Sequence, residues 1–275
     1  MNPSLDPLSV MLLSILQGVT ELFPVSSLGN SVMIPHLLHW NIDPRSDTFL
    51  PLLVTLHLGT AVALLVYFRA TWLDLIRGLT PFSPARPQSR LLLLLIVGTI
   101  PAGLVGLVFE KRIAALFGEF RFVAIFLVLN GVLLFVGEWL RRRAQLGDMH
   151  SLSYLQAFGI GISQALALVP GFSRSGASLA GGLLAGLSHE AAARFSFLLA
   201  TPIILAAGVL ELPKLLGPAA RGDLVVSLMG GLIAGVVAYA STAVLMRYFK
   251  RYEGNALFPF GVYCILLGLA GLLIG

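Results

Sequence analysis

The chain has 275 residues, of which 57% are hydrophobic and 11% are charged. This composition excludes an ordinary soluble domain and predicts a polytopic helical membrane protein forming a single integral membrane domain, 1–275. The net charge of +5 does not indicate a nucleic-acid partner, because the basic residues lie at the ends of apolar segments, as membrane topology requires.

Two further features limit the class of protein. The single cysteine, Cys264, excludes a disulfide within the chain. Met1–Pro7 contains no Lys or Arg, and no small-residue cleavage site clearly follows the first apolar run. We therefore expect no cleavable signal peptide.

The first apolar stretch, Leu8–Trp40, is interrupted by polar and helix-breaking residues. It predicts two short helices joined by a polar loop, because neither part has the ~20 residues that a membrane crossing needs. Non-helical backbone at membrane depth must be buried in protein or line a wet cavity, so we expect a re-entrant hairpin. The interrupting residues are Glu21, Pro24, Ser26, Ser27, Gly29 and Asn30.

Six longer apolar segments predict membrane-spanning helices, three in each half of the chain. His57 lies near the middle of the first of them. The segments are Phe49–Phe68, Leu91–Phe109, Phe122–Leu140, Phe195–Leu212, Leu224–Met246 and Leu257–Ile274.

Between the third and fourth segments, Leu152–Leu187 is again broken by proline, glycine and serine and predicts a second re-entrant hairpin. Its Arg174 is the only charged residue between Asp148 and Glu190. Burying a guanidinium in a membrane is costly, so an isolated intramembrane arginine predicts a functional site.

The two hairpins share a sequence pattern. Ile15-Leu16-Gln17 precedes Pro24-Val25-Ser26-Ser27-Leu28-Gly29, as Ile162-Ser163-Gln164 precedes Pro170-Gly171-Phe172-Ser173-Arg174-Ser175-Gly176. The patterns are about half the chain apart and match with a gap of one residue. They predict two pseudo-repeats, at roughly 8–140 and 152–274.

Charge then predicts orientation. If the loop Arg69–Arg90 is cytoplasmic, eleven basic residues lie inside and six outside, which satisfies the positive-inside rule. The hairpins then enter from opposite sides and meet near the midplane. The expected fold is thus an all-α polytopic membrane protein with about six spanning helices and two re-entrant helical hairpins in an inverted-topology repeat. The six outside residues are Arg45, Lys111, Arg112, Arg121, Lys214 and Arg221.

Each polar loop is followed by a short helix whose N-terminus would point into the membrane centre. Helix N-termini bind phosphate through free amides and the helix dipole, and Arg174 adds a planar guanidinium suited to two phosphate oxygens. This pattern predicts an oxyanion site. Its further hydrogen-bonding residues would be Ser26, Ser27, Ser173, Ser175, Gly176 and Ser178.

Gln17 and Glu21 are four residues apart and share one helix face. Beside phosphate oxygens, the Glu21 carboxylate would be repelled unless it is protonated or bridged by a cation. Mg²⁺ is commonly held by one or two carboxylates and substrate phosphates, so Glu21 is a candidate metal ligand or general base. Gln17 is the second candidate metal ligand. A structural salt bridge between Glu21 and Arg174 is the alternative.

Two motifs resemble those of the bacterial undecaprenyl-diphosphatase family, also called bacitracin-resistance phosphatases. The stretch from Gln17 to Ser27 resembles its (E/Q)xxxE motif followed by PVSS. The stretch from Pro170 to Ser178 resembles its PGxSRSxxT motif, with serine in place of the last threonine.

The resemblance implies a phosphatase that hydrolyses undecaprenyl diphosphate to the monophosphate and so recycles the lipid carrier for cell-wall synthesis. It also implies a divalent cation, Mg²⁺ or Ca²⁺, and a site in the bacterial inner membrane that faces the periplasm. Bacitracin, which binds the lipid, would compete indirectly. The family's site would map onto Gln17, Glu21, Ser26, Ser27, Ser173 and Arg174.

One position departs from the family. A histidine implicated in catalysis is replaced by Asn30, whose amide forms hydrogen bonds but does not titrate near neutral pH. Either the reaction does not need the imidazole, another group replaces it, or activity is low. His57 is the candidate substitute, and a histidine bonded only to a neighbouring helix is the alternative.

The chemistry expected is metal-assisted phosphoryl transfer, with Arg174 holding the developing charge. Ser27 activated by Glu21 and a directly attacking water are both compatible with the sequence. The alternative functions are a flippase or transporter, or a non-catalytic binder, of a polyprenyl phosphate lipid. A small-residue face at Gly268, Gly271 and Gly275 would permit pairing in a homodimer.

Overall fold

The computed structural model describes residues 6–43, 46, 48–116, 119–141, 147–215 and 224–274; of residues 110–115 and 211–215 it describes the backbone only. Within these ranges the regular structure is helical, and the one β contact is an isolated bridge between Gly147 and Leu187. The expected class, an all-α polytopic membrane protein, is confirmed. Four of the basic residues used for orientation, Arg45, Arg142, Arg143 and Arg221, lie outside the described residues, as does Gly275.

Five helices are long and apolar enough to cross a membrane. They correspond to five of the six expected spans: α3 (Phe49–Tyr67), α5 (Pro87–Leu116), α6 (Phe120–Arg141), α9 (His189–Leu215) and α11 (Leu224–Arg251). The sixth, α12 (Phe258–Ile274), is also apolar but has 17 residues, or about 25 Å at 1.5 Å per residue.

The structure adds one helix and moves several of the expected helix boundaries. The segment expected as a cytoplasmic loop begins with a helix, α4 (Arg69–Arg77). Its charged residues kept it below the hydropathy of a spanning segment. Helix α9 begins six residues earlier than expected, at His189 rather than Phe195.

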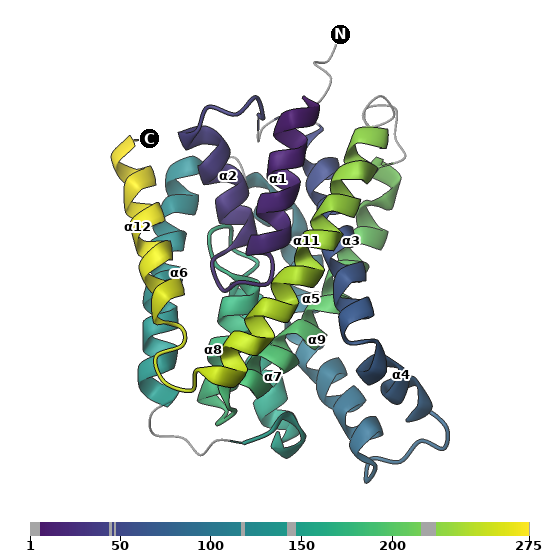
Figure 1. Ribbon diagram of the computed structural model, residues 1–275. Helices are drawn as coiled ribbons and strands as arrows, with labels where there is room; N and C mark the ends of the chain where they lie inside the picture. Colours follow the sequence, from purple (N-terminus) through teal and green to yellow (C-terminus); the bar gives the residue numbers. More distant parts are fainter. Residues whose placement is uncertain are drawn as a thin grey trace.

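Both expected hairpins are present. The first consists of α1 (Pro7–Thr20) and α2 (Ser27–Leu37), and the second of α7 (Tyr154–Leu166) and α8 (Arg174–Leu184). These helices have 11 to 14 residues, about 16–21 Å, which is shorter than the ~30 Å apolar core of a bilayer. Figure 1 shows the hairpins entering from opposite ends of the molecule, with their loops side by side in its middle.

The two halves of the chain are interleaved. Helix α1 packs against α11 of the second half, and α7 packs against α5 of the first half. Helices α3 and α11, and likewise α6 and α12, form further contacts between the halves. This reciprocal packing is what two halves of opposite orientation produce.

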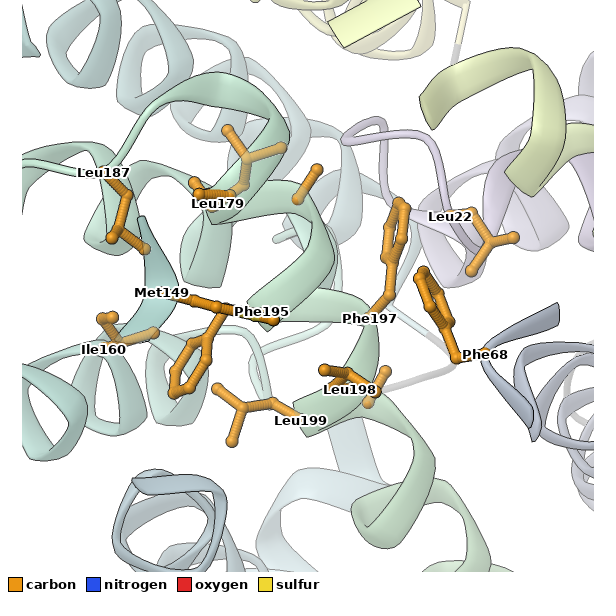
Figure 2. Packing of buried hydrophobic residues seen from close by; sticks show 14 of the residues in the cluster. Leu22, Phe68, Met149, Ile160, Leu179, Leu187, Phe195, Phe197, Leu198 and Leu199 are labelled. Atoms are coloured by element: carbon orange, nitrogen blue, oxygen red, sulfur yellow. The ribbon is translucent and has the colours of Figure 1, made fainter. Parts of the chain in front are cut away.

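The largest apolar cluster is organised around α9, which contacts α3, α5, α8 and α11. Figure 2 shows Phe197 of α9 beside Phe68 and Leu22, with Phe195 on the other side of the same helix. Phe197 lies against Phe68, with the ring centroids 6.4 Å apart. Leu22, from the first hairpin loop, and Leu179, from α8, belong to the same cluster, so the core fixes both hairpins.

The small-residue face of α12 is used within the chain. A Cβ added at Gly268 would lie 2.7 Å from the carbonyl oxygen of Ala124 in α6, and one at Gly271 would clash with the side chain of Met33 in α2. Gly268 and Gly271 therefore let α12 approach its own neighbours and are not available for contact with a second copy; the homodimer itself stays a prediction.

Candidate functional site

The two hairpin loops bring Glu21 and Arg174 into direct contact. The Arg174 guanidinium donates through Nη2 to Glu21 Oε1. Ser27 Oγ donates to Glu21 Oε2 over 2.6 Å, and Gln17 Nε2 donates to the same oxygen over 2.8 Å. His57 Nε2 lies 3.3 Å from it. The buried carboxylate therefore faces one guanidinium, one hydroxyl, one amide and one imidazole.

Local sequence explains how the first loop presents these groups. Gln17 lies in the last turn of α1 and Glu21 follows that helix as its C-cap, so their spacing of four places both on one helix face. Ser26 caps α2 by accepting from Gly29 N over 3.1 Å. Its φ of 64° is sparsely populated for a residue with a Cβ, and such strain is often found at functional sites. Ser27 is thereby the first residue of α2.

The second loop repeats this construction. Ser173 caps α8 by accepting from Gly176 N over 3.0 Å, and Arg174 is the first residue of that helix. In each hairpin, a capping serine directly precedes the residue that contacts Glu21. Both contacts therefore come from helix N-termini, where the helix dipole favours anions.

An amphipathic cavity of about 310 Å³ opens beside this cluster. Its polar end is formed by Glu21, Ser27, His57, Gln164, Ser173 and Arg174. Its apolar walls come from α3, α5, α9 and the second loop: Leu50, Leu53, Val54, Ala102, Leu168, Phe172, Ile203, Ile204 and Ala207 among others. The cavity thus suits a ligand with an anionic head and an apolar tail.

His57 is oriented by two oxygen atoms. Its Nδ1 lies 2.7 Å from the carbonyl oxygen of Leu53, one helical turn earlier, and its Nε2 faces Glu21. A second oxygen partner of this kind fixes the ring orientation. The side chain is 27% exposed and lines the cavity, so the structure places the expected substitute histidine beside the other site residues.

Six of the residues expected in the site do not line this cavity. Ser175 Oγ donates to the carbonyl oxygen of Phe23 over 3.0 Å and so links the loops. Ser178 Oγ donates to the carbonyl oxygen of Arg174 over 2.7 Å. The amide of Gly176 is taken by the Ser173 cap. The remaining three are Gln17, Ser26 and Asn30, and all six hold the loops in place.

Asn30 is fully buried and belongs to the support of the first loop. Its Nδ2 donates to the carbonyl oxygens of Val25 and Ser26, each over 2.9 Å, and its Oδ1 accepts from the Tyr263 hydroxyl. Asn30 was expected at a catalytic position. The structure instead directs its amide at the backbone of the loop and at Tyr263 of α12.

Two polar residues near the site were missing from the expected set. Asn130 of α6 donates to the carbonyl oxygen of Pro24 over 3.1 Å and accepts from Ser173 N over 2.9 Å, so it joins the two loops. Gln164 of α7 lines the cavity. The sequence did contain signals for both residues. Asn130 is the lone asparagine in the apolar segment of α6, and Gln164 aligns with Gln17 in the repeat.

The donor set for a divalent cation is small. Glu21 supplies carboxylate oxygens, and the buried Gln17 Oε1, next to it, has no hydrogen-bond partner. Among the described residues no three His, Cys, Asp or Glu side chains form a cluster that could hold a metal. The Glu21 carboxylate and the Gln17 amide oxygen are too few ligands to hold a cation alone. They therefore fit a cation that is held jointly with substrate phosphates, as Mg²⁺ often is.

Comparisons with known proteins agree with these features. A family model described as bacitracin resistance protein BacA matches residues 10–270. Undecaprenyl-diphosphatase 2 of Chromobacterium violaceum is 52% identical, with 98% of this chain and 99% of the relative covered. Undecaprenyl-diphosphatase of Acidiphilium cryptum is 49% identical over 98% of both chains. Undecaprenyl-diphosphatase 2 of Burkholderia ambifaria is 50% identical over 94% of both.

Proposed function

Since this chain belongs to the bacitracin resistance protein BacA family, we propose that it hydrolyses undecaprenyl diphosphate to undecaprenyl phosphate and inorganic phosphate. The observation that carries this proposal is the cluster of Glu21, Ser27, His57 and Arg174 at the polar end of an amphipathic cavity. The relatives named above are all called diphosphatases, and no observation favours transport or simple binding of the lipid.

The diphosphate would bind at Arg174 and the N-terminus of α8. The Glu21 side chain is 3% exposed, whereas that of Arg174 is 19% exposed and lines the cavity. A purely structural ion pair does not require the guanidinium to reach a cavity. An incoming diphosphate would share or replace the carboxylate as the partner of Arg174, and the guanidinium would stabilise charge on the phosphoryl oxygens. The apolar walls would hold the first part of the prenyl tail.

Ser27 is the best-placed nucleophile. Its hydroxyl already donates to Glu21 Oε2 over 2.6 Å, so the carboxylate would accept the proton as Oγ attacks the terminal phosphorus. The bond from that phosphorus to the bridging oxygen breaks, and undecaprenyl phosphate leaves. Water then hydrolyses the phosphoserine. Direct attack by water activated by Glu21 is the competing route, and acid quenching followed by a search for phosphoserine at Ser27 separates the two.

Two further groups complete the proposed site. His57, bonded to Glu21, would replace the imidazole that the family has at the position of Asn30. A divalent cation, Mg²⁺ or Ca²⁺, would be held by Glu21 and Gln17 together with the diphosphate. When bound, it would neutralise phosphate charge and allow the carboxylate to remain ionised beside the substrate.

The cellular setting follows from the same proposal. The protein would lie in the bacterial inner membrane with the site facing the periplasm, as the excess of basic residues on the other side suggests. It would return the lipid carrier to cell-wall synthesis. It would also give resistance to bacitracin, which would compete by binding the diphosphate lipid.

Release of inorganic phosphate from undecaprenyl diphosphate by detergent-purified protein tests the function. We expect turnover with Mg²⁺ or Ca²⁺, and a loss of at least about 10²-fold in Arg174→Ala, as found for removal of a group that stabilises transition-state charge. Arg77→Ala, which alters an exposed arginine of α4, is the control and should retain activity. If no divalent cation supports phosphate release while the lipid still binds, the protein is a binder or transporter and the proposal is wrong.

A further inference from the structure

Gln164 of α7 is the counterpart of Gln17 in the sequence repeat, but its side-chain amide has no hydrogen-bond partner among the described residues. Its side chain is 1% exposed, and neither Nε2 nor Oε1 has a hydrogen-bond partner in the protein. It nevertheless lines the cavity together with Ser173 and Arg174. A buried amide without partners is unfavourable and rare in folded proteins, so each case requires an explanation.

The pseudo-repeat shows why this amide is free. In the first hairpin, Gln17 is followed four residues later by Glu21, and its Nε2 donates to that carboxylate over 2.8 Å. In the second hairpin, the residue four positions after Gln164 is Leu168, which offers no side-chain acceptor. Leu168 also lines the cavity. The repeat thus keeps the amide at both positions and removes its partner at the one that faces the cavity.

We propose that Gln164 binds the substrate, with its Nε2 donating a hydrogen bond to a non-bridging oxygen of the diphosphate. This inference rests on the proposed function, since it assigns a further binding residue of the same site. Phosphate oxygens at neutral pH accept hydrogen bonds, and the amide nitrogen can only donate. Gln164, near the end of α7, and Arg174, at the start of α8, would hold the headgroup from the two helices of one hairpin.

The test compares Gln164→Met, which keeps the side-chain length without a donor, with Gln164→Glu, which keeps the shape but replaces the donor by an acceptor. Gln88→Met, at an exposed position of α5, is the matched control. The measurements are kcat/KM with undecaprenyl diphosphate, the Tm of the ligand-free protein, and the rise in Tm caused by inorganic pyrophosphate.

We expect Gln164→Met to lower kcat/KM by about 10- to 100-fold, the effect of losing one hydrogen bond to a charged group. The pyrophosphate-induced rise in Tm should shrink, while the ligand-free Tm should equal or exceed that of the wild type, since an unpartnered buried amide is removed. Gln164→Glu should lose more activity because its carboxylate repels the diphosphate, and it decides the question if the methionine variant does not fold.

Three results would overturn the inference. They are turnover within about twofold of wild type in both variants, a lower ligand-free Tm with an unchanged pyrophosphate effect, and a wild-type protein that pyrophosphate does not stabilise. If the wild type releases no phosphate from the lipid, the proposed function fails, but the pyrophosphate measurements still decide whether Gln164 contacts the anion.

Discussion

Glu21 is the residue on which the proposed site depends, because its buried carboxylate contacts four side chains: Gln17, Ser27, His57 and Arg174. A buried charge is stable only when its partners and hydrogen bonds compensate for lost hydration. Only Gln17 lies on the same helix. The carboxylate therefore cannot acquire its surroundings until α2, α3 and α8 have packed around it, so site formation is coupled to folding.

His57 is predicted to contribute to the reaction rather than only to packing. His57→Ala should lower kcat by about 10²-fold or more, the scale of a proton-transfer or positioning group in a phosphoryl-transfer site, because Glu21 would lose one of its four partners. Phosphate release by purified protein measures this. His150→Ala, at an exposed turn away from the cavity, should retain wild-type kcat. Unchanged turnover in His57→Ala would mean that the ring is structural.

Among single residues, the sequence predicted those that meet at Glu21 better than the residues that surround them. Glu21, Ser27, His57 and Arg174 stand out because polar groups in apolar segments require partners. The place of Asn30 could not be predicted, since the direction of its side chain depends on Tyr263, more than two hundred residues later. Gln164 was missed because it stands out only by having no hydrogen-bond partner in the described part of the folded protein, which the sequence does not show.

The hairpins are the elements on which the site is built, and their loops depend on unusual backbone at particular residues. Ser26 has a φ of 64° and Gly171 a φ of 103°. Asn130 of α6 bonds to both loops. The loops are therefore held by α6 as well as by each other, which keeps Ser27 and Arg174 in register.

Gly171→Ala is predicted to destabilise the second hairpin. An alanine would adopt a positive φ that costs about 1–3 kcal/mol, and its Cβ would lie 2.5 Å from the carbonyl oxygen of Val123 in α6. A lower Tm in detergent, together with reduced turnover, is the expected outcome. Gly159→Ala, in α7 of the same hairpin, is the control because its Cβ would meet nothing within 4 Å. That control should be slightly more stable, and equal Tm values for the two variants would contradict the argument.

Some of the helices could be predicted from local sequence and others could not. The hairpins were predictable because proline, glycine and serine interrupt stretches too short to cross a membrane twice. Helix α4 was missed, since Arg69, Asp74 and Arg77 lower its hydropathy while leaving its helix propensity intact. The early start of α9 has a local cause, because Ser188 Oγ accepts from Ala191 N over 3.2 Å and caps the helix. The buried His189 also lies 2.9 Å from Glu138 of α6, a pairing that no local pattern shows.

In the whole molecule, two of the contacts between the halves of the chain differ in kind. At one, α3 crosses α11 closely, with Gly59 against Gly231 and Gly235. At the other, Glu138 of α6 accepts from the backbone amides of Asn255 and Leu257, in and next to the connection between α11 and α12. The repeated motif and the distribution of basic residues predicted two halves of opposite orientation, but the structure was needed to show which helices are in contact.

The close crossing of α3 and α11 leads to a prediction that links stability to the site. A Cβ added at Gly59 would lie 1.9 Å from the carbonyl oxygen of Gly231, so Gly59→Ala must push the two helices apart. Overpacking of this kind costs about 1–3 kcal/mol. His57 lies two residues earlier on α3, and a shift of about 1 Å in a catalytic group can cost about 10²-fold in rate. Tm and kcat should therefore fall together.

Gly103→Ala is the control, because an added Cβ at this position inside α5 would meet nothing within 4 Å. It makes the same chemical change without the contact and should leave both Tm and kcat intact. If Gly59→Ala matched this control in both measurements, the crossing would not position His57, and the coupling between the interface of the halves and the phosphate site would have to be abandoned.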